Sequence, residues 1–524
     1  MLKFSHILGV LGILISCINI LNLSEINMKK RIAFALILMI ICPFVFSGCN
    51  FDSVVNKFSK NLTTYNIEAE YNEENQTISA IEKVTYVNSY SSTLQNVLFH
   101  LYPNAFREGA TYKPVSALDT AKAHPNGANY GSIAIQTVQL NGNNVAVNVG
   151  GADNNILTIE LGEELFPDEK VNLEIAFVLT LPNINHRFGY GENAINLGNW
   201  YPVACVYEDG EFFTKPYSFN GDPFYTDIAN YKVKFSAPEK FIVASSGNQV
   251  SVNTESGVKT LTAEAKAVRD FALVLSDKFE VLSQKVGDTE VKYYYYEDEN
   301  SALSMQTAVD SLKTFNLLIG EYPYRTLSVV KTNFLHGGME YPNLVYISDA
   351  IEDYADYKNV IVHEIAHQWW YGVVGNNQFS EGWLDEGLTE YTTLLFYKLN
   401  PEYERDVELI VKNSLDSYLL FTDVYKQVFG TVNTSMNRAL DEYTTNHEYV
   451  YMAYVKGMLL FENLNNFIGD KKFYSSLKQY YYTNKMTIAT QANLVAAFEK
   501  GAHVNLTSFF NSWVTGTVVI ESIR

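Results

Sequence analysis

Apolar and polar residues alternate along much of the first half of the chain. Apolar side chains occupy every second position over residues 171–181 and again over 231–235, where lysines stand between them. A period of two is typical of a strand with one buried face. Turn-forming pairs such as Asn141-Gly142 separate these runs. The pattern predicts an all-β domain, a sandwich or saddle, over residues 65–276.

The period becomes helical from about residue 300. Apolar residues of the segment 301–318 recur every three or four positions and fall on one stripe, as in an amphipathic helix. We therefore expect a multidomain chain in which the β domain is followed by a mainly helical α+β domain over residues 277–524. The length of 524 residues, too great for one ordinary core, agrees with this division. Further helices are predicted at 360–371, 384–399, 451–467 and 491–500.

The first 49 residues differ in character from the rest. A basic start at 28–31 precedes an apolar run at 32–46 and the tripeptide Ser-Gly-Cys. This is the layout of a secretory signal peptide, and its end resembles a bacterial lipobox, whose cysteine is lipidated. We therefore expect residues 1–48 to be a lipoprotein signal peptide and Cys49 to carry the lipid. The mature protein would be exported and anchored to the outer face of a bacterial cell membrane.

Another apolar stretch, residues 7–21, lies ahead of Met28. Residues 1–27 are then either an upstream segment that is not translated or part of a two-span membrane hairpin. Both apolar runs are shorter than the about 20 residues that a spanning helix needs, which favours the first interpretation. Residues 49–64 are polar without a clear period, and they are interpreted as a tether between anchor and fold.

Charge and cysteine content narrow the remaining classes. The 38 basic and 58 acidic residues give a net charge of −20, which argues against a nucleic-acid partner because nucleic acid selects basic surfaces. Two of the four cysteines, Cys17 and Cys42, lie in the leader. Apart from the lipidation site Cys49, the mature chain then contains one cysteine, Cys205. We expect no internal disulfide in such an exported chain, so its stability must come from packing.

The segment HEIAHQWW, residues 363–370, carries the candidate chemistry. Two histidines four positions apart on a helix, His363 and His367, project from one face and can both bind one zinc ion. Glu364 points about 100° away from His363, towards a water on the metal rather than towards the metal itself. The spacing predicts a zinc site in which Glu364 acts as the general base.

A catalytic zinc has three protein ligands and one open position. Eighteen residues separate His367 from Glu386, which lies in a second predicted helix beginning near Trp383. We expect Glu386 to be the third ligand of one zinc ion per chain, in preference to its neighbours Asp385 and Glu381. Two surface histidines without a metal are the alternative, and the seven other histidines form no comparable cluster in the sequence.

The sequence here resembles the aminopeptidase N family of gluzincin zinc aminopeptidases, whose catalytic domain is thermolysin-like. Residues 336–343, HGGMEYPN, are similar to the family's GxMEN signature, which lines the substrate cleft and whose glutamate holds the free α-amine of the peptide. The resemblance assigns that role to Glu340, because a carboxylate at a fixed distance from zinc selects the first peptide bond. Tyr341 departs from the usual asparagine, and a structural buried Glu340 is the alternative. The residues with family counterparts are Gly337, Gly338, Met339 and Glu340.

Tyr454 and Glu390 are further candidates. The YVKG segment that begins at Tyr454 is similar to the family's YEKG, whose tyrosine donates a hydrogen bond to the tetrahedral oxyanion. Tyr449 and Tyr451 lie close by as competitors for that role. Glu390, one helical turn beyond Glu386, is either the acceptor for a zinc-ligating histidine or a solvated helix residue.

The resemblance covers nearly the whole mature chain, with landmarks at 96–106, 221–227 and 508–514 in family order. It ends at Arg524, where larger members continue into a helical C-terminal domain, so it implies an open cleft that admits longer peptides. The family's second amine-binding residue, contributed by the β domain, has no assigned position in this sequence.

The expected function is removal of the N-terminal residue from peptides that have a free N-terminus. Zinc lowers the pKa of a bound water, Glu364 takes its proton, and Tyr454 stabilises the oxyanion that follows. A thermolysin-like endopeptidase would use the same zinc core without amine selection. A surface lipoprotein that kept the fold without catalysis is the alternative from another class, although no ligand or base is missing that would mark it.

Overall fold

The computed structural model describes residues 51–516 and residue 518 of the chain. The described sheets all belong to one compact unit, Val55–Arg524. The predicted signal peptide and the predicted lipidation site, Cys49, lie outside the described residues. Within the described part, no helix combines the length and the apolar character needed to cross a membrane.

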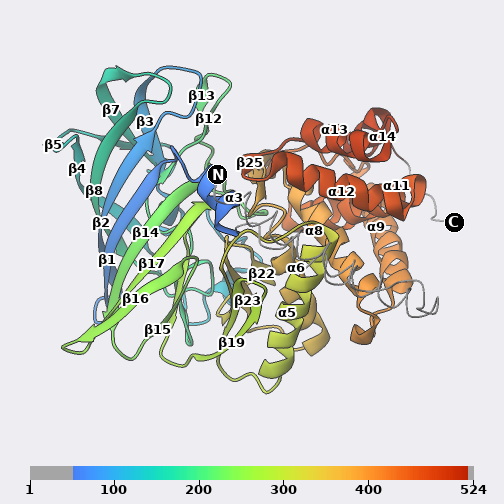
Figure 1. Ribbon diagram of the computed structural model, residues 1–524, viewed down its shortest axis with the longest axis horizontal. Coiled ribbons are helices and arrows are strands. Elements are labelled where there is room, and N and C mark those ends of the chain that lie inside the picture. The colour runs from blue at the N-terminus through green and yellow to red at the C-terminus, as the bar shows by residue number, and fades with distance from the viewer. Residues whose placement is uncertain (1–50, 517, 519–524) are drawn as a thin grey trace, which may run out of the picture. The chain divides into compact units, whose positions relative to one another are not determined.

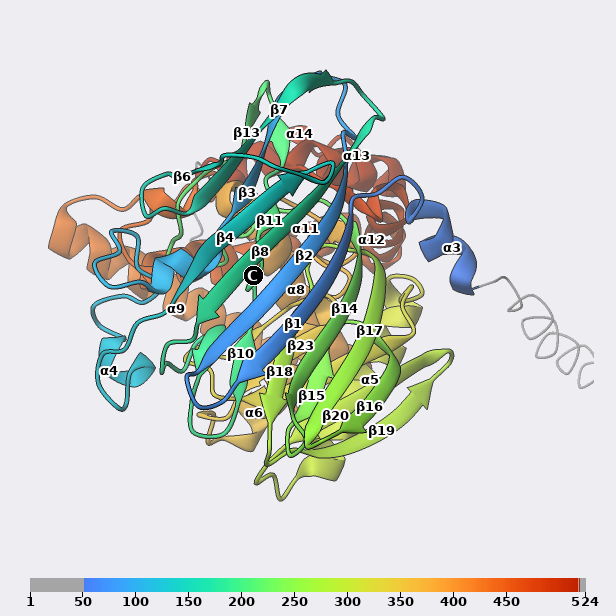
Figure 2. The same cartoon turned by 90° about the vertical axis from the view of Figure 1, so that its left-hand side faces the viewer.

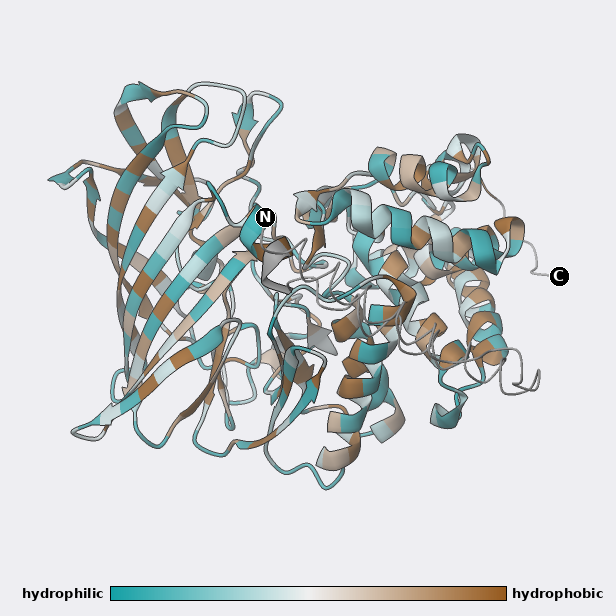
Figure 3. Ribbon diagram, in the orientation of Figure 1, coloured by the Kyte–Doolittle hydropathy of each residue, from teal (hydrophilic) through white to brown (hydrophobic). Residues whose placement is uncertain are grey.

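An eight-stranded sheet dominates the first half of the unit Val55–Arg524 (Figure 1, Figure 2). Buried and exposed residues alternate along most of its strands, and apolar and polar colours alternate with them in Figure 3. This is the period of two seen in the sequence, and it buries one face of the sheet. In order across the sheet, the strands are β16 (Asn248–Glu255), β17 (Val258–Val268), β14 (Ala229–Pro238), β1 (Thr64–Asn72), β2 (Thr77–Val87), β8 (Lys170–Thr180), β4 (Ser132–Leu140) and β5 (Asn143–Asn144). Only β1 and β14 pair in parallel.

Smaller sheets complete this β domain. One four-stranded sheet has the order β15 (Ile242–Ser245), β18 (Leu273–Ser276), β10 (Ile195–Leu197) and β9 (Phe188–Tyr190). Another has the order β11 (Val203–Ala204), β3 (Leu94–His100), β7 (Ile156–Leu165) and β6 (Asn148–Gly150), and β12 (Tyr207–Glu208) pairs with β13 (Glu211–Phe212). Two short helices, η1 (Tyr102–Phe106) and α4 (Thr120–Ala123), interrupt the strands. The strands of these sheets run from Thr64 to Ser276, so they begin one residue before the range predicted for the all-β domain and end with it.

A separate five-stranded sheet begins after residue 276, at the predicted domain boundary. Its order is β19 (Glu280–Val286), β20 (Thr289–Tyr295), β21 (Thr326–Thr332), β23 (Leu344–Ser348) and β22 (Gly338–Met339). The edge strand β22 runs antiparallel to β23 and lies within the HGGME segment, residues 336–340. Because β22 is an edge strand, only one side of its backbone is paired within the sheet, and the other is left for the cleft.

Helices make up most of the rest of the chain, in line with the predicted α+β domain. They are α5 (Ser301–Leu318), α6 (Tyr354–Ala366), α7 (Gln378–Glu381), α8 (Trp383–Leu399), η2 (Pro401–Tyr403), α9 (Val407–Phe429), η3 (Leu440–Glu442), α10 (Asn446–Val450), the π-helix η4 (Tyr451–Lys456), α11 (Gly457–Ile468), α12 (Asp470–Asn484), α13 (Gln491–Ala502) and α14 (Thr507–Val514). Two short strands in this region, β24 (Val374–Gly375) and β25 (Thr487–Ile488), pair with each other in parallel. The fold is thus a β-rich domain followed by a mainly helical one.

The predicted helices are present, but their limits and number differ from the sequence pattern. The helix predicted at 360–371 begins earlier, at Tyr354, because the side chain of Asp353 accepts a hydrogen bond from the Asp356 amide and caps it. It ends at Ala366, before the predicted end. The pattern missed α9, α12 and α14, whose apolar positions are shared with many tyrosines or left partly exposed.

The predicted tether contains a helix, α3 (Phe51–Phe58), that the sequence analysis did not indicate. Val54, Val55 and Phe58 are spaced for one helical face, and Val55 and Phe58 pack against the hydrophobic core. The polar residues between them hid this period.

Arg269 joins the β domain to the helical domain. Its guanidinium is buried and donates hydrogen bonds to the carbonyl oxygens of Thr226 (3.1 Å), Tyr371 (2.9 Å) and Thr487. Thr226 belongs to the β domain, whereas Tyr371 and Thr487 belong to the helical one. Because one charged group satisfies three buried carbonyls, it links the two domains firmly.

Candidate metal centre and substrate cleft

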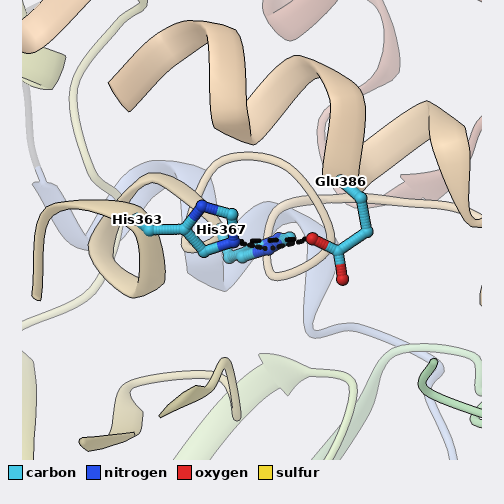
Figure 4. A group of neighbouring side chains, drawn as sticks. All are labelled: His363, His367 and Glu386. Atoms are coloured by element: carbon cyan, nitrogen blue, oxygen red, sulfur yellow. Dashed lines mark hydrogen bonds and ion pairs between the residues drawn. The ribbon is translucent and has the colours of Figure 1, made fainter. Parts of the chain in front are cut away.

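Two consecutive long helices bring three metal-binding side chains to one point (Figure 4). His363 lies in the last turn of α6, His367 is its C-terminal capping residue, and Glu386 lies in the first turn of α8. The Nε2 atoms of His363 and His367 are 3.1 Å apart. Oε2 of Glu386 lies 3.4 Å from Nε2 of His363 and 3.1 Å from Nε2 of His367. All three side chains are buried.

This donor set fits a zinc ion. Ligands at about 2.0–2.1 Å from a tetrahedral zinc are about 3.3 Å from one another, which matches the observed separations. Nδ1 of His363 lies 2.9 Å from Oε2 of Glu390, and Nδ1 of His367 lies 3.0 Å from the carbonyl oxygen of Trp370. Each ring therefore donates its proton through Nδ1, and the two Nε2 lone pairs face each other and a carboxylate. A positive charge between these atoms, from a metal ion or from a proton, stabilises such an arrangement.

Electrostatics also favour positive charge at this point. Burial opposes a charge on His363, yet the carboxylates of Glu386 and Glu390 outweigh it and raise the pKa of the imidazole. Burial likewise opposes ionisation of Glu386, but the charge of His367 and hydrogen bonds from both histidines lower the pKa of Glu386 to about 2. The charges of the protein groups alone thus favour a cation at this point.

The structure favours the first of the two roles considered for Glu390, since its carboxylate accepts a hydrogen bond from Nδ1 of His363 rather than pointing into solvent. A carboxylate behind a ligating histidine fixes the ring and its tautomer. The competitors for the third ligand have hydrogen-bond partners of their own, although Asp385 also lies within 4.8 Å of His367 and Glu340. Asp385 accepts a hydrogen bond from Gln378 (2.9 Å), and Glu381 accepts one from the amide of Gln491 (3.3 Å).

Glu364 lies beside the metal donors and lines the cleft. Burial raises the pKa of its carboxyl to about 8, although the charges of His363 and His367 oppose this rise. A metal ion at the two histidines would favour the charged form and bring the pKa back towards neutrality. Gly338 leaves room for this side chain, because a Cβ there would meet the carboxylate. A carboxyl poised near neutral pH suits a general base that later acts as an acid.

Tyr454 reaches the same centre from the π-helix η4. Its hydroxyl donates to Oε1 of Glu386 at 2.5 Å, and its ring stacks on His363 with centroids 6.0 Å apart. Burial raises the pKa of Tyr454, so the hydroxyl stays protonated and remains a donor. Short π-helical segments are frequent at functional sites. Of its predicted competitors, Tyr451 stacks on Phe421, whereas Tyr449 also lines the cleft.

The backbones of two helices touch beside this centre. An ideal Cβ on Gly457 would lie 2.6 Å from the Cα of Gly387, and one on Gly387 would lie 2.8 Å from the Cα of Gly457. Gly387 follows the ligand Glu386, and Gly457 comes three residues after Tyr454. Glycine at both positions therefore sets the distance between the carboxylate ligand and the tyrosine hydroxyl.

Glu340 lies at the end of β22, buried next to the metal donors. The side-chain amide of Gln378 donates to Oε1 of Glu340 (2.6 Å) and to Asp385, which fixes the direction of the carboxylate. A second carboxylate, Asp222, comes from the β domain, and its oxygen lies within 4.8 Å of those of Glu340 and Glu386. These carboxylates form an anionic pocket beside the metal centre.

Sequence reasoning did not find Asp222. It belongs to the landmark at 221–227, but it lies in an irregular loop, where no period shows which way a side chain points. The altered signature residue, Tyr341, turns away from the cleft, and its hydroxyl donates to Oδ1 of Asn199 (2.8 Å).

These groups surround a cavity of about 340 Å³. Gly337, Gly338 and Glu340 line it, as do His363, Glu364 and Tyr454. Met339, the remaining residue of the predicted substrate-binding set, does not line the cavity, and its side chain is fully buried in the core, so substrate binding by Met339 stays a prediction. Alternate residues of a strand face opposite ways, so Met339 points away from the side shared by Gly338 and Glu340.

A β-rich domain followed by a helical domain, with two histidines and a glutamate around one point, defines a metallopeptidase of the HExxH class. Residues 303–513 match the sequence model of the peptidase family M1 domain. Residues 303–513 therefore form a peptidase family M1 domain, and the family resemblance and the fold class predicted from sequence are confirmed.

Known proteins similar to the chain agree with this assignment. Leucine aminopeptidase 2-1 of Meyerozyma guilliermondii is 27% identical over 163 residues, which cover 30% of this chain and 25% of that protein. The thyrotropin-releasing hormone-degrading ectoenzyme of Mus musculus is 28% identical over 170 residues, which cover 30% of this chain and 15% of that protein. The chain thus spans a quarter or less of these curated relatives. The M1 zinc metallopeptidase from Deinococcus radiodurans shares the fold, with a TM-score of 0.62, 16% identity and coverage of 87% of this chain and 94% of that chain.

Proposed function

We propose that the chain is a zinc aminopeptidase that removes the N-terminal residue from peptides with a free N-terminus. The observation that carries this proposal is the pair of buried carboxylates, Glu340 and Asp222, within 4.8 Å of a carboxylate that also faces the metal position. A substrate ammonium held there leaves room for only one residue before the scissile bond reaches the metal. The similar leucine aminopeptidase supports the same reaction class.

The chain's own residues supply most of the mechanism. Glu364 takes a proton from the attacking water at its carboxylate and returns it to the departing amine. Tyr454 donates its hydroxyl proton in a hydrogen bond to the carbonyl oxygen as negative charge develops there. One zinc ion, held by His363, His367 and Glu386, would polarise the scissile carbonyl and acidify the water.

A pair of peptides that differ only at the N-terminus tests the proposal. The zinc-loaded protein should cleave a free tripeptide about 10- to 100-fold faster than its N-acetylated form, because the acetyl group removes a charge-assisted contact. Chelation should abolish cleavage and added zinc should restore it. Equal cleavage of the two peptides, or cuts at internal bonds, would favour a thermolysin-like endopeptidase, and no cleavage at all would favour an inert lipoprotein.

Glu340→Gln assigns the selectivity to a residue. The variant should lose most of the preference for the free N-terminus because the glutamine carries no charge. Glu82→Gln is the matched control, since Glu82 is also fully buried but lies in β2 of the β domain and does not line the cleft. If both variants keep the preference, Glu340 does not hold the amine.

We also propose that the protein acts outside the cell, held to the outer face of the membrane by a lipid on Cys49. The basic and apolar leader that ends at Cys49 supports this placement. Replacement Cys49→Ser should move the protein from the membrane fraction to the soluble fraction. A wild-type N-terminus ahead of residue 49 in the mature protein, read by mass spectrometry, would contradict cleavage there.

A further inference from the structure

Arg187 is a buried cation on the wall of the substrate cleft. It directly precedes β9 in the β domain and is only 5% exposed. Its Nη2 lies 2.8 Å from Oδ1 of Asp222, and the guanidinium carbon lies 5.0 Å from the ring centre of Phe224. An ion pair and a cation–π contact thus hold Arg187 in one position.

The charges around the cleft show why such a residue matters. Among the described residues that line the cavity, Arg187 is the only lysine or arginine, against five carboxylates. Asp222 lies close to Glu340 and Glu386, and buried carboxylates this near disfavour one another's negative charge. A guanidinium keeps its charge and its planar shape, so it can offset that repulsion and fix the direction of Asp222.

We propose that Arg187 is a positioning residue that holds Asp222 as the β-domain half of the amine-binding pocket. This inference rests on the proposed aminopeptidase function. The pocket would then be assembled from two domains: Arg187 and Asp222 come from the β domain, and Glu340 and Glu386 from the helical one. A substrate ammonium would complete the contact between them.

Direct binding of substrate by Arg187 is a different role that the geometry disfavours. Nε and Nη1 of Arg187 have almost no accessible surface, and Nη2 is engaged by Asp222. An acidic N-terminal side chain would have to displace Asp222 to reach the guanidinium. We therefore expect Arg187 to affect binding of the amine and not to select acidic N-terminal residues.

The test compares two small ligands that differ by one amine, L-leucine and 4-methylpentanoate. Their dissociation constants for the zinc-loaded protein, measured by calorimetry, give the preference for the amine without any turnover. Arg187→Met should reduce that preference by about tenfold or more, as loss of a charge-assisted contact does. For a free leucyl peptide, KM should rise by a similar factor while kcat changes by less than about threefold.

Other variants separate positioning from general stability. Arg187→Lys keeps the charge but not the planar group, so it should recover part of the preference. Arg269→Met removes another buried arginine that joins the domains, and it should lower the melting temperature without changing the preference. The double variant Arg187→Met with Asp222→Asn should lose no more of the amine preference than the more affected single variant, because both changes act through the carboxylate of Asp222.

Three results would overturn the assignment. One is an unchanged amine preference in folded Arg187→Met, and another is an equal loss of preference in Arg269→Met. The third is a wild-type preference for N-terminal glutamate that Arg187→Met abolishes, which would show direct contact with substrate. A protein that cleaves no peptide yet prefers L-leucine would contradict the proposed function while still supporting the role of Arg187.

Discussion

The glycine contact between α8 and α11 allows a substitution far from any ligand to test the geometry of the site. Gly457→Ala adds one methyl group whose carbon would lie 2.6 Å from the Cα of Gly387. Carbon atoms in ordinary contact are about 3.5–4.0 Å apart, so the helices must separate by about 1 Å. Neither backbone can turn aside as a flexible side chain would.

This separation should act on both ends of the catalytic centre. Glu386 precedes Gly387 in α8, and Tyr454 lies three residues before Gly457, in the π-helix that leads into α11. The hydrogen-bonded oxygens of Glu386 and Tyr454 are 2.5 Å apart. A displacement of about 1 Å at a reacting centre can lower the rate on the order of 100-fold. Overpacking of this kind also lowers the free energy of unfolding by about 1–3 kcal/mol. We expect kcat/KM to fall far more than stability alone explains.

The assay measures kcat/KM for a free peptide, zinc content and thermal stability in the same preparations. Gly501→Ala is the matched control, since a Cβ there would lie 2.4 Å from the Cα of Ser476 at the contact of α12 and α13. Neither residue lines the cleft, so that variant should lose stability and keep kcat/KM. Wild-type kcat/KM in Gly457→Ala, with zinc retained, would refute the argument that this contact sets the site.

Three further predictions concern single side chains. Glu364→Gln should keep zinc but lower kcat by about 10²- to 10⁴-fold, and wild-type turnover would remove its role as base. Glu390→Gln should weaken zinc binding by about 10- to 100-fold in competition with a chelator, because His363 loses a charged acceptor; unchanged affinity would contradict this. Burial, with Arg438 nearby, lowers the pKa of Lys456 to about 7, whereas the unfolded chain keeps that proton to about pH 10.4. Between these values the unfolded state binds more protons, so this group makes the folded protein more stable as pH rises, by up to about 1.4 kcal/mol per pH unit. Denaturant titrations at several pH values should show that slope in wild type and not in Lys456→Met, and parallel curves would contradict it.

Local patterns in the sequence predicted much of the site. The spacing of His363 and His367 required one helical face, and the structure places both rings on it. The helical period alone gives this result, because it fixes side-chain directions within a few residues. Glu386 and Glu340 were instead selected by resemblance to the spacing and the cleft motif of the family.

Residues in loops and at helix contacts could not be placed in this way. Arg187 and Asp222 have no periodic neighbours, so the sequence does not show that they meet. The motif suggested Met339 for the cleft, yet the alternation of β22 turned it into the core. The backbone contact at Gly457 likewise depends on how two helices pack.

The amino-acid sequence by itself determined the β-to-helix order of the chain, the metal-binding motif and the resemblance of its second half to a peptidase family. Tertiary structure alone decided which carboxylates surround the proposed amine pocket, which cation pairs with one of them, and how far the hydroxyl of Tyr454 lies from Glu386. The physical reason is that hydrophobic period records which face of each element is buried. Convergence of side chains from separate elements depends on packing between them, which no local pattern contains.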